Sequence, residues 1–378
     1  MSDLFPAYCE LISSPVQLAR CHMATSVSGL LSVIKELWQQ TTLGDDQLLA
    51  ALAQLNQQVI DSDKILLAGH WLPYRYNAKT SSISWCLPAG HATEPFQDET
   101  ISRYRQTILV NQLITPKTSL STLDIQARLV PSIMPAGFIF HLSRCGSTLI
   151  SGCLSELDTT SVFSESPVLT ELLLDQVLGE ATQQKHLQQL IDLQASVFPT
   201  RPHVVIKWNA WDIFRWKLIR AIYPHVPSIF LVRNPVEILA SHHRLAGRHM
   251  SGDPTLADVH LVFNKNQRTP KSLLDFRIGV LDGLLAEMQS IGMESPVYRV
   301  DYRQLDLDKL SEISVCFRIP FVEEEVCRMK SRLGFHSKSP MLRFNDDVTE
   351  KQTLFNADDV ALIQRALLPP YNQFFDNN

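Results

Sequence analysis

The sequence has no apolar run that approaches the roughly 18 consecutive residues of a membrane-spanning helix. Its first residues, MSDLFPAYCEL, include an acidic residue at position 3 and no apolar segment as long as that of a secretory signal. These two absences predict a soluble protein of the cytoplasm that does not associate with a membrane.

Cysteine is scarce, and its spacing excludes the usual cysteine-based frameworks. The seven cysteines are an odd number without a CxxC pair: Cys9, Cys21, Cys86, Cys145, Cys153, Cys316 and Cys327. Such spacing is typical of reduced thiols in a cytoplasmic protein. Because no histidine and cysteine cluster has the spacing of metal ligands, we expect no metal ion.

An excess of positive charge is also missing. The formal net charge is −5, with 19% charged and 45% hydrophobic residues among 378. This composition is that of an ordinary globular protein and argues against general binding of nucleic acid, which needs a broad basic surface. A few concentrated cations must therefore hold any anionic ligand.

The first third of the chain predicts an appendage, residues 1–130, before the main domain. Residues 1–63 have a helical spacing behind a cap at Asp45, through Leu48, Leu52, Leu55 and Val59. Residues 64–130 are irregular and rich in aromatic residues, with short strands expected near Ile83, Trp85 and Leu87.

From residue 131 onward, short apolar runs alternate with helical stretches. The runs are GFIFHL (137–142), TSVFSE (160–165), HVVIK (203–207), SIFLV (228–232) and VYRVDY (297–302). Apolar runs with helices between them are typical of a mostly parallel sheet buried on both faces. Residues 131–378 therefore predict a three-layer α/β domain, which includes a helix over 272–290.

A candidate phosphate loop follows the first of these runs. HLSRCGSTLI places a turn with one glycine before a helix, through Arg144, Cys145, Gly146, Ser147 and Thr148. Backbone N–H groups and the helix dipole at such a junction favour an anion. An ordinary serine-rich helix cap is the alternative. The loop lacks the GxxxxGK[ST] pattern of nucleotide kinases.

Three further strand ends carry side chains suited to a nucleotide. Lys207 ends HVVIK, and Arg233 follows SIFLV with Ser241 eight residues later. Tyr302 ends VYRVDY, where its ring would suit an adenine. Because ligands of open α/β sheets bind at the carboxyl ends of strands, these cations predict one anion site.

SRCGSTL resembles the 5′-phosphosulfate loop of the sulfotransferases that use PAPS (3′-phosphoadenosine-5′-phosphosulfate), and LVRNPVEILAS is similar to their 3′-phosphate signature. VYRVDYRQL resembles the family's strand that leads into the adenine site. The likeness covers residues 137–305. It implies the P-loop-like sulfotransferase fold, PAPS as cosubstrate without a metal, and a cofactor site of Arg144, Cys145, Gly146, Ser147, Thr148, Arg233, Ser241 and Tyr302.

The chain departs from the family at three places. Cys145 stands where a serine is usual, and the basic R-K-G loop is missing, for which Lys338, Ser339 and Lys351 are possible substitutes. Asn209 occupies the place of the histidine base. The resemblance then favours Glu165 as general base beside Lys207, with His141, His242 and His243 as the next candidates.

The predicted reaction moves a sulfuryl group from PAPS to a hydroxyl or amine, with a small molecule as the expected acceptor. Two other interpretations stay open. One is a kinase-type phosphotransferase, which the missing GK pair and the Arg233 and Ser241 pair disfavour. The other is a nucleotide-binding interaction protein without turnover. The sequence leaves the acceptor and the oligomeric state open.

Overall fold

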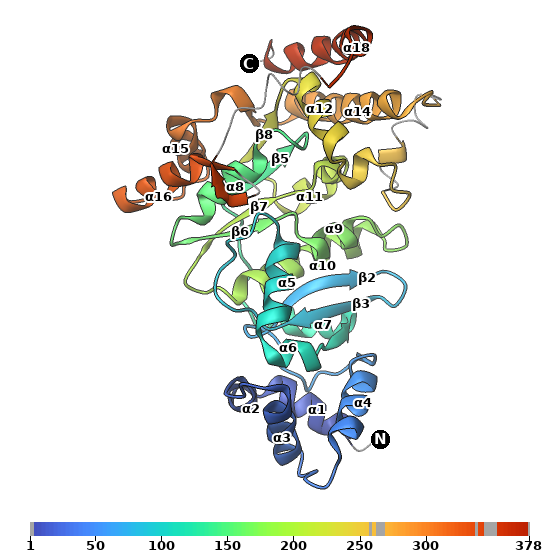
Figure 1. Ribbon diagram of the computed structural model, residues 1–378, viewed down its shortest axis with the longest axis vertical. Helices are drawn as coiled ribbons and strands as arrows, with labels where there is room; N and C mark the ends of the chain where they lie inside the picture. Colours follow the sequence, from blue (N-terminus) through green and yellow to red (C-terminus); the bar gives the residue numbers. More distant parts are fainter. Residues whose placement is uncertain (1–3, 257–258, 262–268, 337–338, 344–353, 377–378) are drawn as a thin grey trace. The chain divides into compact units, whose positions relative to one another are not determined.

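The computed structural model describes residues 4–256, 259–261, 269–336, 339–343 and 354–376 (Figure 1). The chain forms two compact units. The first consists of Met1–Ile133 and Ser166–Pro202, and the second of Met134–Glu165 and His203–Asn378. The sequence predicted one boundary at residue 130. The chain passes from the first unit to the second after Ile133. It returns to the first unit for Ser166–Pro202 and then enters the second unit again.

Four helices open the first unit, as the sequence predicted for residues 1–63: α1 (Leu4–Ser13), α2 (Pro15–His22), α3 (Val27–Leu37) and α4 (Asp45–Leu55). Serines begin two of them, because Ser14 accepts a hydrogen bond from the N–H of Gln17 and Ser26 from that of Gly29. The expectation for Val59 was wrong, since it lies in strand β1 (Val59–Ile60) and is exposed. The cap of α4 is Gly44, with Asp45 as its first helical residue.

A small sheet follows, with the strand order β1-β4-β3-β2. The predicted strands are present as β2 (Leu72–Asn77) and β3 (Ser82–Cys86), joined by β4 (Lys117–Ser119). Three helices in this zone were not predicted: α5 (Gln97–Thr107), α6 (Leu109–Leu113) and α7 (Leu120–Ala127). Helix α5 gives no hydrophobic periodicity, because its sequence QDETISRYRQT is mostly polar and its buried apolar side chains are only Ile101 and Tyr104. Helices α9 (Pro167–Leu173) and α10 (Glu180–Ser196) complete the unit.

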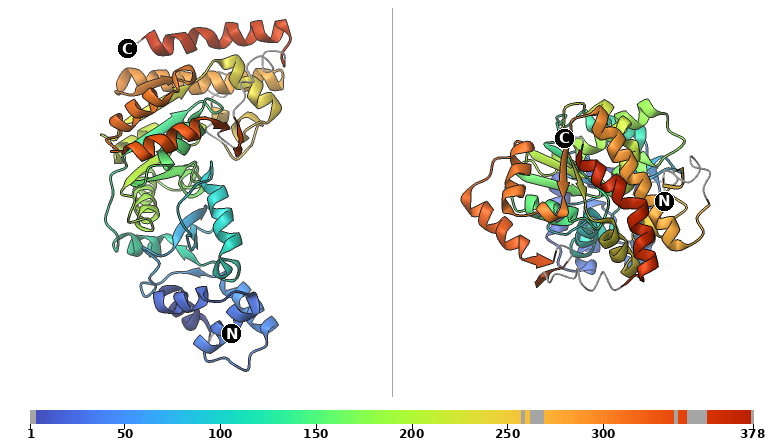
Figure 2. Two further views of the ribbon diagram at one scale, coloured as in Figure 1. Left: turned by 60° about the vertical axis from the view of Figure 1, so that its left-hand side comes forward. Right: turned by 90° about the horizontal axis from the view of Figure 1, so that it is seen from above.

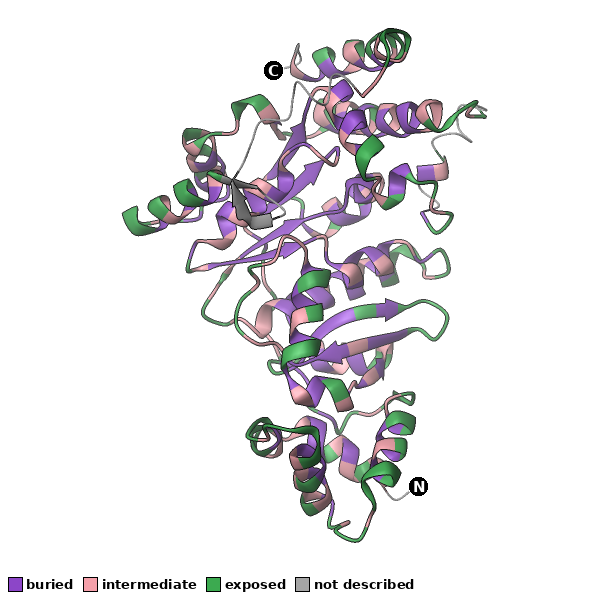
Figure 3. Ribbon diagram, in the orientation of Figure 1, coloured by how far each residue is buried: buried purple, intermediate pink, exposed green. Residues whose placement is uncertain are grey.

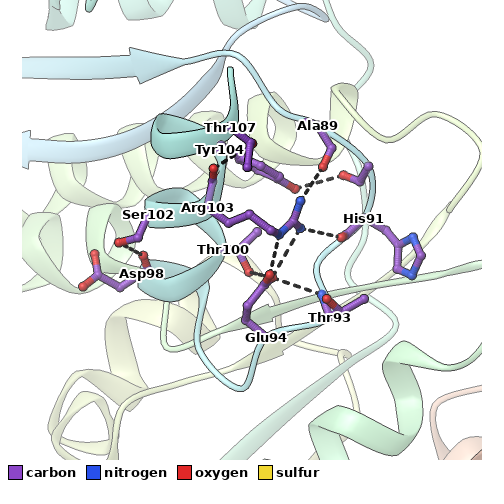
Figure 4. A network of polar contacts seen from close by, with 11 residues as sticks. Ala89, His91, Thr93, Glu94, Asp98, Thr100, Ser102, Arg103, Tyr104 and Thr107 are labelled. Atoms are coloured by element: carbon purple, nitrogen blue, oxygen red, sulfur yellow. Dashed lines mark hydrogen bonds and ion pairs between the residues drawn. The ribbon is translucent and has the colours of Figure 1, made fainter. Parts of the chain in front are cut away.

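Polar contacts fix the loop between β3 and α5 (Figure 4). Arg103 forms an ion pair with Glu94 and donates to the backbone oxygens of Ala89 at 2.9 Å and His91 at 3.0 Å. The Tyr104 hydroxyl donates to the oxygen of Gly90 at 2.9 Å. The loop therefore finds its hydrogen-bond partners within its own neighbourhood.

The second unit contains a five-stranded sheet in the order β6-β7-β5-β8-β9, in which every neighbouring pair is parallel. This confirms the predicted fold class. The strands match the five apolar runs: β5 (Gly137–His141), β6 (Thr160–Ser164), β7 (His203–Lys207), β8 (Ser228–Val232) and β9 (Tyr298–Asp301). Their residues are almost all buried, as the purple arrows of Figure 3 show.

The alternation of side chains along the strands gives the sheet two different faces. Ile139, Ile229 and Val205 pack in an aliphatic cluster with residues of α8 (Ser147–Ser155), α15 (Leu307–Cys316) and α16 (Glu323–Leu333). Phe140 belongs to the opposite, aromatic face, where its ring lies 6.0 Å from Trp208 and 5.7 Å from Phe230. Helices therefore cover both sides of a parallel sheet.

Two long helices lie together in this unit, α14 (Leu273–Glu294) and the C-terminal α18 (Ala357–Asp376) (Figure 2). The sequence predicted the first of these over 272–290. The side chain of Gln289 donates to the backbone oxygen of Pro370 at 2.6 Å, which ties the two helices together. None of the helices in the described ranges is long and apolar enough to cross a bilayer. All seven cysteines carry free thiols.

Candidate functional site

The sequence-predicted site residues follow the carboxyl ends of neighbouring strands. The loop after β5 carries Arg144 and Gly146, Glu165 directly follows β6, and Lys207 is the last residue of β7. Arg233 follows β8, and Tyr302 follows β9 at the start of the short 3₁₀ helix η3 (Tyr302–Gln304). The parallel order of the strands explains why one edge of the sheet receives all of them.

The loop between β5 and α8 has an unusual backbone. Ser143, Arg144 and Gly146 have φ values of 65°, 52° and 91°, in the left-handed region. Gly146 precedes the first turn of α8, and a Cβ atom on it would lie 2.6 Å from Cδ2 of Tyr302. Only glycine fits there, and the N-terminal end of a helix such as α8 directs backbone N–H groups toward the loop, which suits an anion.

Cys145 points away from this loop into the aliphatic core. Its Sγ donates to the backbone oxygen of Leu231 at 3.3 Å, and burial raises the pKa of its thiol to about 12. The thiol therefore faces the core and not the surface of the loop. The predicted contribution of the Cys145 backbone N–H stays a prediction.

Lys207 and Glu165 form the charged centre of the site. Nζ of Lys207 lies 2.7 Å from Oε1 of Glu165 and donates to Oγ1 of Thr148, in the first turn of α8, at 3.1 Å. Nε2 of His141 lies 3.5 Å from the same Glu165 oxygen. Lys207 is fully buried, whereas the Glu165 side chain retains 23% exposure. The lysine thus connects the predicted phosphate loop to the predicted base.

Charge determines the protonation states in this cluster. Burial raises the pKa of Glu165, but Lys207 and His141 lower it by more, so its pKa lies below its ordinary value. Burial lowers the pKa of His141 and outweighs the opposing effect of Glu165. Glu165 is therefore a carboxylate and His141 neutral near pH 7.

The backbone of Glu165 is strained as well. Its φ is 53°, a region that a glutamate seldom adopts, and its N–H donates to the backbone oxygen of Lys207 at 2.7 Å. Strain of this kind costs about 1–3 kcal/mol and clusters at functional sites.

A second group of residues surrounds Arg233. Its guanidinium lies 4.0 Å from the centre of the Tyr302 ring, and its Nε donates to Glu237 at 2.6 Å. Its Nη1 donates to the backbone oxygen of Arg144 at 3.5 Å. Tyr302 therefore lies between Gly146 and Arg233. The structure brings together the predicted phosphate loop, the arginine predicted to bind a 3′-phosphate and the tyrosine predicted to contact adenine.

Ser241 lies on α12 (Pro235–Arg244), eight residues after Arg233, and is half-buried. The helix begins at Asn234, whose side chain accepts from the N–H of Val236 at 2.9 Å. Arg144 reaches the loop after this helix, where its Nη2 donates to the backbone oxygen of Leu245 at 2.7 Å. Of the proposed substitutes for the basic loop, Lys338 and Lys351 lie outside the described residues, and Ser339 begins strand β11 (Ser339–Arg343).

Asn209, which replaces the expected histidine, has a structural role. It begins the 3₁₀ helix η1 (Ala210–Arg215), and its N–H donates to Oδ2 of Asp212 at 2.9 Å. Of the alternative bases, His141 lies 3.5 Å from Glu165, His242 is buried, and His243 is exposed with its ring against Phe355.

Two residues near the site were missed by the sequence analysis, Trp211 of η1 and His249 of η2 (Arg248–Met250). Both are buried, with their ring centres 5.5 Å apart. No periodicity or motif marks either residue, because each lies in a short 3₁₀ helix. Within the described ranges, no group of three or more histidine, cysteine, aspartate or glutamate side chains is arranged to hold a metal ion.

No family model and no curated protein matches the sequence. The structure resembles sulfotransferase STF9 from Mycobacterium avium, with a TM-score of 0.45 and 11% identity over 88% of this chain and 96% of that one. It also resembles sulfotransferase STF1 from Mycobacterium tuberculosis H37Rv, with a TM-score of 0.39 and 14% identity over 64% and 78% of the two chains. The sulfotransferase domain of the Synechococcus PCC 7002 olefin synthase has a TM-score of 0.36 and 14% identity, over 62% and 94%. These likenesses are distant, so the residues of the site carry the functional proposal.

Proposed function

We propose that this protein is a sulfotransferase that moves a sulfuryl group from PAPS to an acceptor, which we take to be a small molecule. The observation that carries the proposal is the position of Lys207 between Oγ1 of Thr148 and Oε1 of Glu165. One buried cation thereby contacts both the loop suited to an anion and the carboxylate suited to accept a proton.

In this proposal, the two groups of residues bind different parts of PAPS. The loop of Arg144, Cys145, Gly146, Ser147 and Thr148 holds the 5′ phosphosulfate, while Arg233 and Ser241 hold the 3′-phosphate and Tyr302 contacts the adenine. Lys207 stabilises negative charge on the transferring group, as preorganised donors do in enzymes. Neutralisation by these side chains and backbone N–H groups needs no metal.

Glu165 is the proposed base, and its low pKa makes it a weak one while Lys207 pairs with it. A sulfuryl group beside Lys207 would offset the positive charge that lowers this pKa. The carboxylate would then become more basic at the stage when the acceptor loses its proton. His141, 3.5 Å away, is the next candidate.

Titration calorimetry with three nucleotides tests the cofactor. Adenosine 3′,5′-bisphosphate should bind far more tightly than adenosine 5′-monophosphate or ATP with magnesium, because charge-assisted contacts to one phosphate contribute about 1.5–3 kcal/mol each. Arg233→Ala should remove most of that preference. Arg20→Ala is the control, since Arg20 forms an exposed pair with Glu36. Equal affinities in the wild type would refute PAPS, and a preference for ATP would favour a phosphotransferase.

The acceptor requires a separate search. A metabolite extract incubated with PAPS and the protein should yield products that gain the mass of a sulfuryl group. Selective binding of the bisphosphate without any such product would instead favour a nucleotide-binding protein without turnover.

A further inference from the structure

His249 and Trp211 form a buried pair of polar rings in the second unit. Their centres lie 5.5 Å apart at an interplanar angle of 45°. His249 retains 3% and Trp211 6% of its exposure. Both are held in short 3₁₀ helices, η2 and η1, rather than in the regular core of the sheet.

Three nitrogen atoms of this pair have no hydrogen-bond partner among the residues that the structure describes. They are Nδ1 and Nε2 of His249 and Nε1 of Trp211. Roughly 90% or more of buried polar groups in proteins are paired, and an unpaired one costs about 1–3 kcal/mol. Two neighbouring residues that keep three such atoms therefore indicate a place where a ligand supplies the partners.

The pair lies close along the chain to residues of the site. Trp211 is four residues after Lys207, and Arg144 donates to the backbone oxygen of Leu245, four residues before His249, at 2.7 Å. Burial lowers the pKa of His249 to about 3, and His141 and Arg144 oppose its protonation while Glu165 favours it. His249 is therefore a neutral imidazole near pH 7. In that state one ring nitrogen donates a hydrogen bond and the other accepts one.

Gly247 and the His242 ring pack against the imidazole, with the two histidine ring centres 5.3 Å apart, and Arg248 packs against the indole. A Cβ atom on Gly247 would lie 3.2 Å from Cε1 and 3.3 Å from Nδ1 of His249, so glycine keeps this approach open. Arg248 lies over the Trp211 ring at 5.7 Å and pairs with Asp253 at 2.9 Å. The guanidinium covers a face of the indole, and the Nε1–H group of Trp211 remains without a partner among the described residues.

We infer that His249 and Trp211 bind the acceptor of the proposed sulfuryl transfer and that this acceptor is an alcohol or a phenol. The identification of this ligand as the acceptor rests on the proposed function, but the inference that the pair binds a hydroxyl group does not. A hydroxyl group donates to the unprotonated nitrogen of His249 and accepts from Nε1–H of Trp211. A neutral amine that accepts from the indole uses its single lone pair and has none left to attack sulfur, whereas a hydroxyl oxygen has two. The pair therefore favours sulfation of oxygen.

The first test measures stability without any ligand. His249→Phe removes two unpaired polar atoms and keeps an aromatic ring, so its thermal midpoint should equal or exceed that of the wild type. The matched control is His186→Phe, because His186 is also buried but its Nδ1 contacts Gln189 at 2.9 Å and lies 3.6 Å from Asp124. That control should lower the midpoint. An equal loss in both variants would make His249 a structural residue.

The second test uses phenol and toluene as probes, and its decisive comparison is made in the wild-type protein. The indole N–H signal of Trp211, assigned by its loss in Trp211→Phe, should shift with phenol and not with toluene. In His249→Phe the difference between the probes should shrink at least severalfold. Equal responses to both probes in the wild type would overturn the inference.

The two proposals can fail separately. A phenol-selective shift in a protein that does not prefer adenosine 3′,5′-bisphosphate would keep the hydroxyl site and reject the sulfotransferase. The opposite result would keep PAPS as the donor and place the acceptor elsewhere.

Discussion

Two glutamates of this protein, each paired with a basic side chain, lie in contrasting surroundings. Glu94 in the first unit pairs with Arg103, which also donates to Ala89 and His91, and the Thr100 hydroxyl donates to Glu94 at 2.8 Å (Figure 4). Every partner in this network comes from the loop that it stabilises or from the helix that follows. Its charges and hydrogen bonds are complete without a ligand.

The cluster of Glu165 in the second unit is built differently. Its members come from three separate strands and from α8, and the backbone of Glu165 is in the left-handed region. His249, whose pKa is affected by the charge of Glu165, has ring nitrogens without partners among the described residues. The Glu94 network is therefore typical of a contact that stabilises a fold, whereas backbone strain and unpaired polar atoms are more frequent at functional sites.

Replacement of the carboxylate should produce the largest effect. Glu165→Gln keeps the shape of the side chain and removes the proposed base, so kcat should fall roughly a hundred- to ten-thousandfold while nucleotide binding survives. Rates would be measured with an acceptor from the extract screen. Glu94→Gln is the matched control and should turn over at the wild-type rate. Near wild-type turnover in Glu165→Gln would transfer the role of base to His141.

Removal of the lysine should have the next largest effect. Lys207→Met takes away the cation beside the transferring group, and kcat should fall on the order of a hundredfold or more. Affinity for adenosine 3′,5′-bisphosphate should change less than turnover. Lys185→Met, which removes an exposed partner of Asp124, serves as the control. A normal kcat with a raised KM would identify Lys207 as a residue that binds substrate and transition state equally.

Disruption of the first-unit network should instead affect stability. Arg103→Met leaves Glu94 and the oxygens of Ala89 and His91 without their donor, at a cost of about 1–3 kcal/mol in the free energy of unfolding. Urea unfolding would measure this, with Arg20→Met as an exposed control that changes little. If Arg103→Met abolished turnover without loss of stability, the contrast between the two clusters would not hold.

A decrease in pH should have the smallest effect, a change in the free energy of unfolding. Because the pKa of Glu165 is depressed in the folded protein, its pairing contributes stability above its unfolded pKa, about 4.3, and that stability is lost as the pH falls below it. The difference in unfolding free energy between wild type and Glu165→Gln should therefore narrow from pH 6 to lower pH. A difference independent of pH would show that the pairing with Lys207 does not persist in solution.

The five apolar runs and the residues after them were readable from the sequence, because strands buried on both faces leave continuous hydrophobic segments. The parallel order of those strands then required Glu165, Lys207 and Arg233 to approach the same edge of the sheet. The helices α5 and α7 were not readable, since polar sequences with few buried positions leave no periodic signal. Val59 shows the same limit, because its place in a two-residue strand depends on pairing with Lys117.

By itself, the sequence determined the α/β class, the glycine at the start of α8 and the identity of the charged side chains, because local spacing and residue type encode them. Tertiary structure alone decided the rest. It turned the side chain of the loop residue Cys145 into the core, lowered the pKa of Glu165 through a lysine from another strand, and joined His249 to Trp211 across 38 residues of sequence. Each of these depends on distances between segments that lie far apart in the chain, and charge and desolvation act through those distances.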